Sequence, residues 1–231
     1  MKKVITTLAL AITAMSAQAE ITGNAGLVSD YRFRGISQTQ GGAALQGGVD
    51  YAHKSGFYIG NWNSSVSSDI YTNGAGLESD IYGGYKAKFG GVTLDVGALS
   101  YKYSGAKAFN TDEVYAGAGI GPVSAKVSHT YSSKYFNTAN AKGTKYYEVN
   151  FAQAISKVTV VAHAGRTDVA NQTDGDYNDY NAGVVVAVGG FDLGAKYYVN
   201  NEMNSTFKTS NTVNGEKNYD KGFVLSVTKA F

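Results

Sequence analysis

The chain has 231 residues, with 29 glycines, 18 tyrosines, 10 phenylalanines, one proline and no cysteine. The lack of cysteine excludes disulfides and thiolate sites, and the abundance of aromatic residues beside a single proline favours extended sheet. A formal net charge of only +2 argues against nucleic acid as a partner, because such proteins need a basic surface.

Residues 1–19 have the three-part layout of a secretory signal peptide. Lys2 and Lys3 precede an apolar stretch from Val4 to Met15, and the small-residue triplet AQA follows at positions 17–19. A membrane anchor would need about 20 apolar residues, and this stretch is shorter. We therefore predict export with cleavage before Glu20, which leaves one domain over residues 20–231.

Apolar and polar residues alternate along most of the remaining chain, which predicts about twelve strands. In chain order, the apolar faces cover residues 21–33, 45–51, 57–59, 81–85, 92–98, 114–120, 123–131, 147–151, 158–164, 180–186, 191–197 and 223–231. The third strand has the weakest pattern, because Tyr58, Gly60 and Trp62 compete with Phe57 and Ile59 for the apolar face.

The expected connections alternate between tight turns and long polar loops. The turns fall at 53–56, 89–91, 121–122, 155–157 and 189–190, and the loops at 36–42, 66–76, 104–111, 132–143, 167–176 and 201–220. Antiparallel strands would place all the turns at one end and all the loops at the other, which is the outer-membrane pattern. We predict an all-β fold, a single transmembrane antiparallel up-and-down β-barrel. A soluble sandwich or lipocalin-like barrel is the alternative, although nothing would sort its loops by length.

Aromatic residues lie near both ends of the apolar faces, where they would form girdles at the two membrane interfaces. The loop-end set is Tyr31, Phe33, Tyr131, Tyr147, Tyr180, Tyr197 and Phe223, and the turn-end set is Tyr51, Phe57, Tyr85, Phe89, Phe191 and Phe231. The apolar face of the last strand is interrupted by Lys229 and ends on Phe231. A terminal aromatic of this kind resembles the signal read by the outer-membrane barrel assembly machinery, so we expect that machinery and outer-membrane lipid as partners.

Several segments resemble the TorF-type porin family of proteobacterial outer-membrane proteins. They are VSDYRFRGISQ at 28–38, GFYIGNW at 56–62, ESDIYGGY at 78–85, YKYSG at 101–105, EVYAG at 113–117 and DYNDY at 176–180. The chain has Ser104 where members often carry a proline. The resemblance spans essentially the whole chain after the signal peptide, and it implies a bacterial outer-membrane location and a barrel fold more strongly than any particular solute.

Charged residues on the opposite strand faces would line the lumen. Twelve strands tilted about 40° give a backbone radius of roughly 12 Å, and inward side chains would narrow the passage to the width of a small solute. The loop-side candidates for this constriction are Arg32, Arg34, Glu78, Asp80, Glu113, Glu148 and Asp179. We predict a channel for passive diffusion of small hydrophilic solutes, with no enzymatic activity and no cofactor.

Two arrangements of these charges stay open. The arginines could face an acidic arc across the lumen and create a transverse field that favours cations. Alternatively, they could reach across, pair with the carboxylates and plug the barrel.

Other functions are also conceivable for such a barrel. One is a closed structural or adhesive barrel, and another is a hydrolase built on Ser128 or Ser132 with His129. Neighbours in one strand point to opposite faces, so Ser128 and His129 would not pair. Calcium binding by Asp174, Asp176 and Asp179 is disfavoured because the spacing of a dedicated calcium loop is missing.

Overall fold

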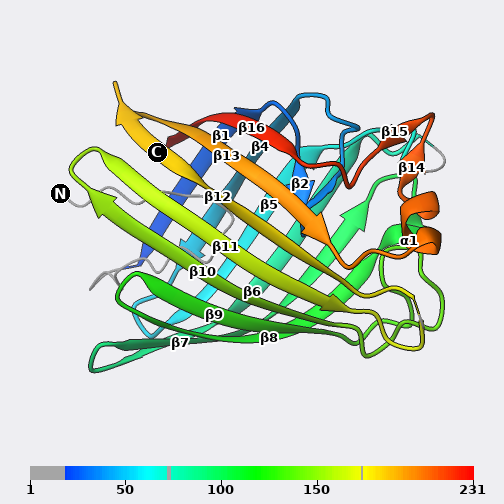
Figure 1. Ribbon diagram of the computed structural model, residues 1–231. Helices are drawn as coiled ribbons and strands as arrows, with labels where there is room; N and C mark the ends of the chain where they lie inside the picture. Colours follow the sequence, from blue (N-terminus) through cyan, green and yellow to red (C-terminus); the bar gives the residue numbers. More distant parts are fainter. Residues whose placement is uncertain (1–18, 72–73, 173) are drawn as a thin grey trace.

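The computed structural model describes residues 19–71, 74–172 and 174–231. Across them, twelve antiparallel strands close into one barrel, in which each strand pairs with its neighbours in the chain and the first pairs with the last (Figure 1). They are β1 (Glu20–Val28), β4 (Ala44–Ala52), β5 (Phe57–Ser65), β6 (Leu77–Phe89), β7 (Val92–Tyr103), β8 (Thr111–Ile120), β9 (Val123–Thr130), β10 (Lys145–Ile155), β11 (Val158–Asp168), β12 (Tyr177–Val188), β13 (Phe191–Asn201) and β16 (Gly222–Ala230). The predicted up-and-down barrel is confirmed.

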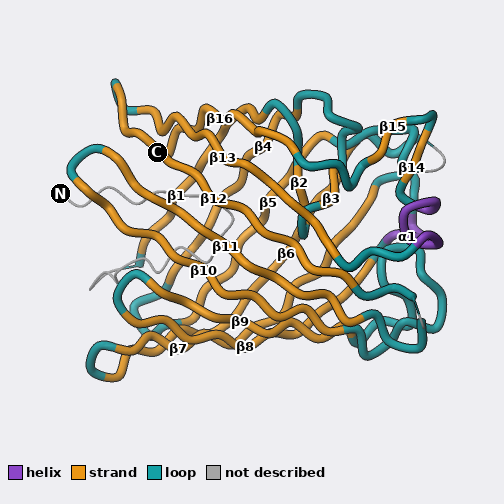
Figure 2. Tube along the Cα trace, viewed as in Figure 1, coloured by secondary structure: helices purple, strands orange, loops and turns teal. Residues whose placement is uncertain are grey.

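Connections of unequal length lie at the two ends of the barrel. Five tight turns connect strands at one end, near the C-terminus, whereas the long connections and helix α1 (Ser205–Ser210) lie at the other (Figures 1 and 2). The loop end also holds η1 (Lys107–Phe109) and a small hairpin of β14 (Thr212–Val213) and β15 (Glu216–Lys217). The predicted sorting of turns and loops is confirmed. The described residues contain no helix long and apolar enough to cross a membrane.

The outer surface of the barrel wall is mainly apolar. Ile21, Leu45, Phe57 and Leu225 are each at least 60% exposed, and the remaining large exposed hydrophobics alternate along the strands in the same way. Phe57 and Ile59 face outward while Trp62 is buried, which settles the ambiguous third strand. Exposed aromatics gather toward both ends of the wall, including Tyr131, Tyr147, Tyr180 and Phe223 at the loop end and Tyr51, Tyr85, Phe89, Phe191 and Phe231 at the turn end.

The first strand is shorter than the sequence predicts. It ends at Val28 rather than Phe33, and residues 29–43 leave the wall to form a small hairpin of β2 (Arg32–Phe33) and β3 (Ile36–Ser37), which we call the inner hairpin. Its side chains contact inward residues of β5, β6, β8 and β10, so it occupies the loop end of the barrel interior. Figure 2 shows β2 and β3 near that end.

Tyr31 and Phe33 therefore do not belong to the outer aromatic girdle. Tyr31 is 5% exposed, and the Phe33 ring packs edge-on against Tyr101 and Phe136, with centroid distances of 5.4 and 5.2 Å. The interior offers these side chains aromatic partners, and the alternating pattern of a short hairpin resembles a continuing strand. Periodicity alone therefore cannot distinguish a residue of the barrel wall from a residue of a hairpin inside the barrel.

Candidate functional site

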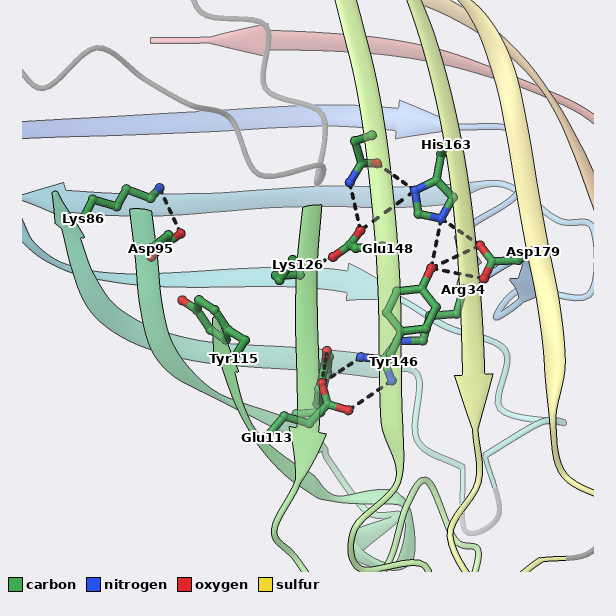
Figure 3. Close-up of polar contacts among 12 residues, drawn as sticks. Arg34, Lys86, Asp95, Glu113, Tyr115, Lys126, Tyr146, Glu148, His163 and Asp179 are labelled. Carbon is green, nitrogen blue, oxygen red and sulfur yellow. Dashed lines mark hydrogen bonds and ion pairs between the residues drawn. The ribbon is translucent and has the colours of Figure 1, made fainter. Parts of the chain in front are cut away.

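Arg34, at the tip of the inner hairpin, forms a buried ion pair with Glu113 of the barrel wall. The two terminal nitrogens of the Arg34 guanidinium donate to Glu113 of β8, at 3.0 Å (Nη1 to Oε1) and 2.7 Å (Nη2 to Oε2). Nη1 also donates to the Tyr135 hydroxyl at 3.0 Å. The guanidinium lies over the Tyr146 ring, 4.2 Å from its centroid. Figure 3 shows this bidentate pair. Its two parallel hydrogen bonds fix the position of the hairpin tip, and its opposite charges attract each other.

The backbone at the tip requires glycine. Arg34 and Gly35 both have positive φ, at 47° and 79°. A side chain at Gly35 would also meet the Asn200 side chain of β13, because an added Cβ would lie 2.7 Å from Asn200 Cγ. The hairpin tip thus packs directly against the wall.

Two further carboxylates lie on the inward face of β6. Glu78 is fully buried and Asp80 is 3% exposed. Glu78 Oε1 accepts a 3.3 Å hydrogen bond from the Tyr31 hydroxyl of the hairpin. Among the described residues, Glu78 Oε2 and Asp80 Oδ1 have no hydrogen-bond partner.

On the wall formed by β9 to β12, polar side chains connect into one network (Figure 3). His163 Nε2 lies 2.9 Å from Asp179 Oδ1 and 2.9 Å from the Tyr146 hydroxyl, and its Nδ1 lies 2.7 Å from Asn150 Oδ1. The same Nδ1 is 3.9 Å from Glu148 Oε2, and Glu148 Oε1 pairs with Lys126 Nζ at 2.6 Å. These contacts join Lys126, Glu148, His163 and Asp179 into one continuous polar line along the interior.

A separate group lies nearer the turn end. Lys86 Nζ is 3.7 Å from Asp95 Oδ2, and Asp95 Oδ1 accepts a 2.7 Å hydrogen bond from the Tyr58 hydroxyl. The Tyr58 hydroxyl also bonds the Tyr115 hydroxyl, and the Lys86 ammonium lies over the Tyr58 ring. Polar contacts therefore continue beyond the inner hairpin toward the other mouth.

Arg32 has a different role from Arg34. It pairs with Asp30 at the base of the hairpin, and its Nη1 donates to the backbone carbonyls of Asp220 at 2.7 Å and Asn218 at 3.3 Å. These contacts attach the hairpin to the connection that precedes β16. Within the described residues, Arg32 thus forms no ion pair with the predicted acidic arc of Glu78, Asp80, Glu113, Glu148 and Asp179.

The five acidic candidates lie at inward positions of wall strands, and Arg34 reaches one of them from the inner hairpin, but the seven candidates form separate groups. Arg34 meets Glu113, whereas Glu148 and Asp179 join through His163. Glu78 and Asp80 stay apart from any arginine among the described residues. Of the two arrangements left open by the sequence, cross-lumen pairing holds for Arg34 and not for Arg32.

The sequence analysis did not select several interior residues that the structure connects to the site. Lys86, Asp95, Lys126 and Tyr146 all follow the same inward register as the predicted residues, so period-2 alternation could have found them. Lys126 is paired directly opposite Glu148 across β9 and β10. These four residues were not selected because only charged residues near the loop end were considered as candidates.

The two disfavoured chemistries gain no support from the geometry. No group of three metal-ligating side chains occurs within residues 19–71, 74–172 and 174–231. Asp179 bonds Tyr146 in the interior, whereas Asp176 pairs with Arg166 at 3.2 Å. Ser128 is buried, and His129, the next residue of the strand, is partly exposed on the opposite face.

Residues 12–231 match the model of a family described as "Bacterial protein of unknown function (Gcw_chp)". The chain belongs to this family. No curated protein matches this Gcw_chp chain.

Solved structures show what the Gcw_chp barrel is similar to. One is described as "KdgM porin", with 7% sequence identity, a TM-score of 0.58 and coverage of 92% of this chain and 99% of that chain. Another is a NanC porin, with 9% identity, a TM-score of 0.56 and coverage of 91% and 98%. At these identities the likeness shows a shared barrel fold, which spans almost the full length of both neighbours.

Proposed function

We propose that this Gcw_chp protein is an outer-membrane channel through which small hydrophilic solutes diffuse passively along a narrow, charged lumen. The observation that carries the proposal is the polarity of the closed barrel, which is apolar outside and charged inside. A soluble barrel has its polar face toward water, so this inverted arrangement suits a wall in lipid.

The expected route of the chain supports an outer-membrane location. Residues 1–19 have the features of a signal peptide, and Phe231 directly follows the closing strand, where an aromatic residue would serve as a signal for the barrel assembly machinery. The motif resemblance to TorF-type porins supports the same location. The exposed aromatics at both ends of the wall fit the two membrane interfaces.

The inner hairpin is the proposed constriction. It brings Arg34 across to Glu113 and leaves the buried carboxylates of Glu78 and Asp80 beside it, so acidic side chains outnumber basic ones at the loop end of the interior. Structures of the same fold are described as porins, and one of them is titled "KdgM porin in complex with disordered oligogalacturonate". That ligand is a polyanion, and the acidic character of this constriction favours solutes of the opposite charge.

A closed structural barrel is the second candidate, and the packed loop end favours it. Glu113 and Glu78 are almost completely shielded from solvent, and the ion pair of Arg34 with Glu113 joins the inner hairpin to the wall. Such packing would seal the barrel unless the inner hairpin moves.

Conductance in planar bilayers tests the proposal. Purified protein, folded in detergent and shown to shift its gel mobility on boiling, should give stepwise current increases when added to a bilayer. Boiled protein is the control. A folded sample that inserts and gives no steps would establish the closed barrel instead.

A further inference from the structure

Glu78 and Asp80 form a buried pair of carboxylates without a cation. They are two residues apart on β6, so both side chains point to the same inward face. Neither forms an ion pair within the described part of the chain, and Arg34, the cation at the hairpin tip, is already bound on both nitrogens by Glu113. Two buried acidic groups without a positive partner are costly, which suggests that something else neutralises them.

Aromatic rings surround the two carboxylates. Asp80 is paired in register with Trp62 of β5 and with Tyr101 of β7, and Glu78 is paired with Tyr103 of β7. From the inner hairpin, the Tyr31 ring lies edge-on to Trp62 with centroids 5.4 Å apart. Negative charge framed by aromatic faces attracts organic cations, because both the carboxylates and the ring faces favour positive charge.

The free hydrogen-bond acceptors match one cationic group in particular. Among the described residues, Glu78 Oε2 and Asp80 Oδ1 have no donor, and Glu78 Oε1 accepts a 3.3 Å bond from the Tyr31 hydroxyl. A primary ammonium carries three N–H donors and no acceptor. Its donors equal in number the two free oxygens and Glu78 Oε1, where an ammonium would take the place of the Tyr31 hydroxyl.

We propose that Glu78 and Asp80, with Trp62 and Tyr31, form a binding site for solutes that carry a primary ammonium group. The inference deepens the proposed function, and it rests on the proposed channel for the route by which the solute arrives. Binding exchanges the long Tyr31 hydrogen bond for charge-assisted ones, which are shorter and stronger. The same exchange releases one contact between the inner hairpin and the wall.

Trp62 provides a direct readout, because it is the only tryptophan of the chain and is paired with Asp80. Detergent-folded protein is titrated with methylammonium chloride while Trp62 fluorescence is recorded, and sodium chloride at equal ionic strength is the reference. We expect a saturable change with methylammonium and only a small, non-saturating drift with sodium. Glu78→Gln with Asp80→Asn should weaken the response at least tenfold, whereas the control Asp112→Asn, which alters an outward carboxylate at the same end, should retain it.

Three results would overturn the site: no saturable response in folded protein, an equal response to sodium, or an undiminished response in the double variant. The shift in gel mobility on boiling verifies folding, and the two single variants replace the double variant if it does not fold. A saturable response without bilayer conductance would keep the site and reject the channel. Conductance without a response would reject the site alone.

Discussion

The side chain of Arg34 joins the tip of the inner hairpin to the barrel wall through Glu113. Its burial lowers the pKa of the guanidinium, but the neighbouring charge of Glu113 more than offsets this effect, so the pKa of Arg34 is held above its ordinary value. The side chain stays charged at any pH at which the protein would work. Glu113 depends on it, because a buried carboxylate that loses its cation is strongly destabilised.

Arg34→Ala is expected to release the hairpin tip and increase single-channel conductance. Removing one partner of a buried ion pair costs roughly 3 to 5 kcal/mol, which is enough to shift the hairpin toward an open position. Bilayer recordings measure the conductance, and urea unfolding measures the lost stability. Arg34→Ala combined with Glu113→Gln should recover part of the stability and keep the higher conductance. Conductance equal to that of the unaltered protein in both variants would contradict a role in constriction.

The positions of the interior charges could be predicted from the sequence, whereas their partners could not. Alternation placed the five acidic candidates on the inward faces of their strands, since the side-chain period of a strand is fixed. The two arginines lie on the inner hairpin, which alternation did not predict. Arg32 and Arg34 follow the same pattern two positions apart, yet Arg34 pairs with a residue 79 positions away and Arg32 pairs with Asp30. Pairing depends on where the hairpin turns, and periodicity carries no information about that turn.

At the scale of elements, the inner hairpin interrupts an otherwise regular barrel. The residues on either side of it, Val28 and Ala44, are paired partners in the β1–β4 ladder. The wall is therefore complete without the hairpin. The sequence pattern predicted the five tight turns and placed this long connection at 36–42, whereas it spans residues 29–43. The start was placed too late because alternation continues through Tyr31 and Phe33.

Replacing residues 31–38 by two glycines should raise the conductance several-fold and leave the barrel folded, because Val28 and Ala44 can be bridged by a short turn. Single-channel recording tests the first expectation, and the shift in gel mobility on boiling tests the second. Removal of residues 204–211, which include α1, is the matched control and should change conductance much less. Equal effects of the two deletions would show that the hairpin is not the narrowest point.

At the scale of the whole molecule, the side chain of Phe231 is largely exposed, and the residue directly follows the last strand of the barrel. It is 75% exposed, and its backbone exchanges hydrogen bonds with Gly23 at 2.8 and 2.9 Å. Closure of the barrel uses these backbone bonds, and the ring lies over Gly23 with most of its surface exposed. Recognition during assembly is the role that the sequence predicts.

Phe231→Ala should reduce the amount of folded protein in the outer membrane of cells by about tenfold while leaving the conductance of protein refolded in detergent unchanged. The backbone bonds to Gly23 remain, so the mature barrel is intact. Fractionation of cells measures the first quantity, and bilayer recording of refolded protein measures the second. A refolded variant with altered conductance would assign the ring a structural role instead.

The seam between β1 and β16 has five paired residues, fewer than the twelve between β6 and β7. This seam joins the two ends of the described chain. The entropic cost of bringing its strands together is therefore larger than the cost of forming any hairpin of the barrel, and local folding cannot form it. Until it forms, the molecule is a curved open sheet with two bare edges, which a hydrocarbon layer does not accommodate. In a membrane, strand insertion and closure of this short seam would therefore have to proceed together.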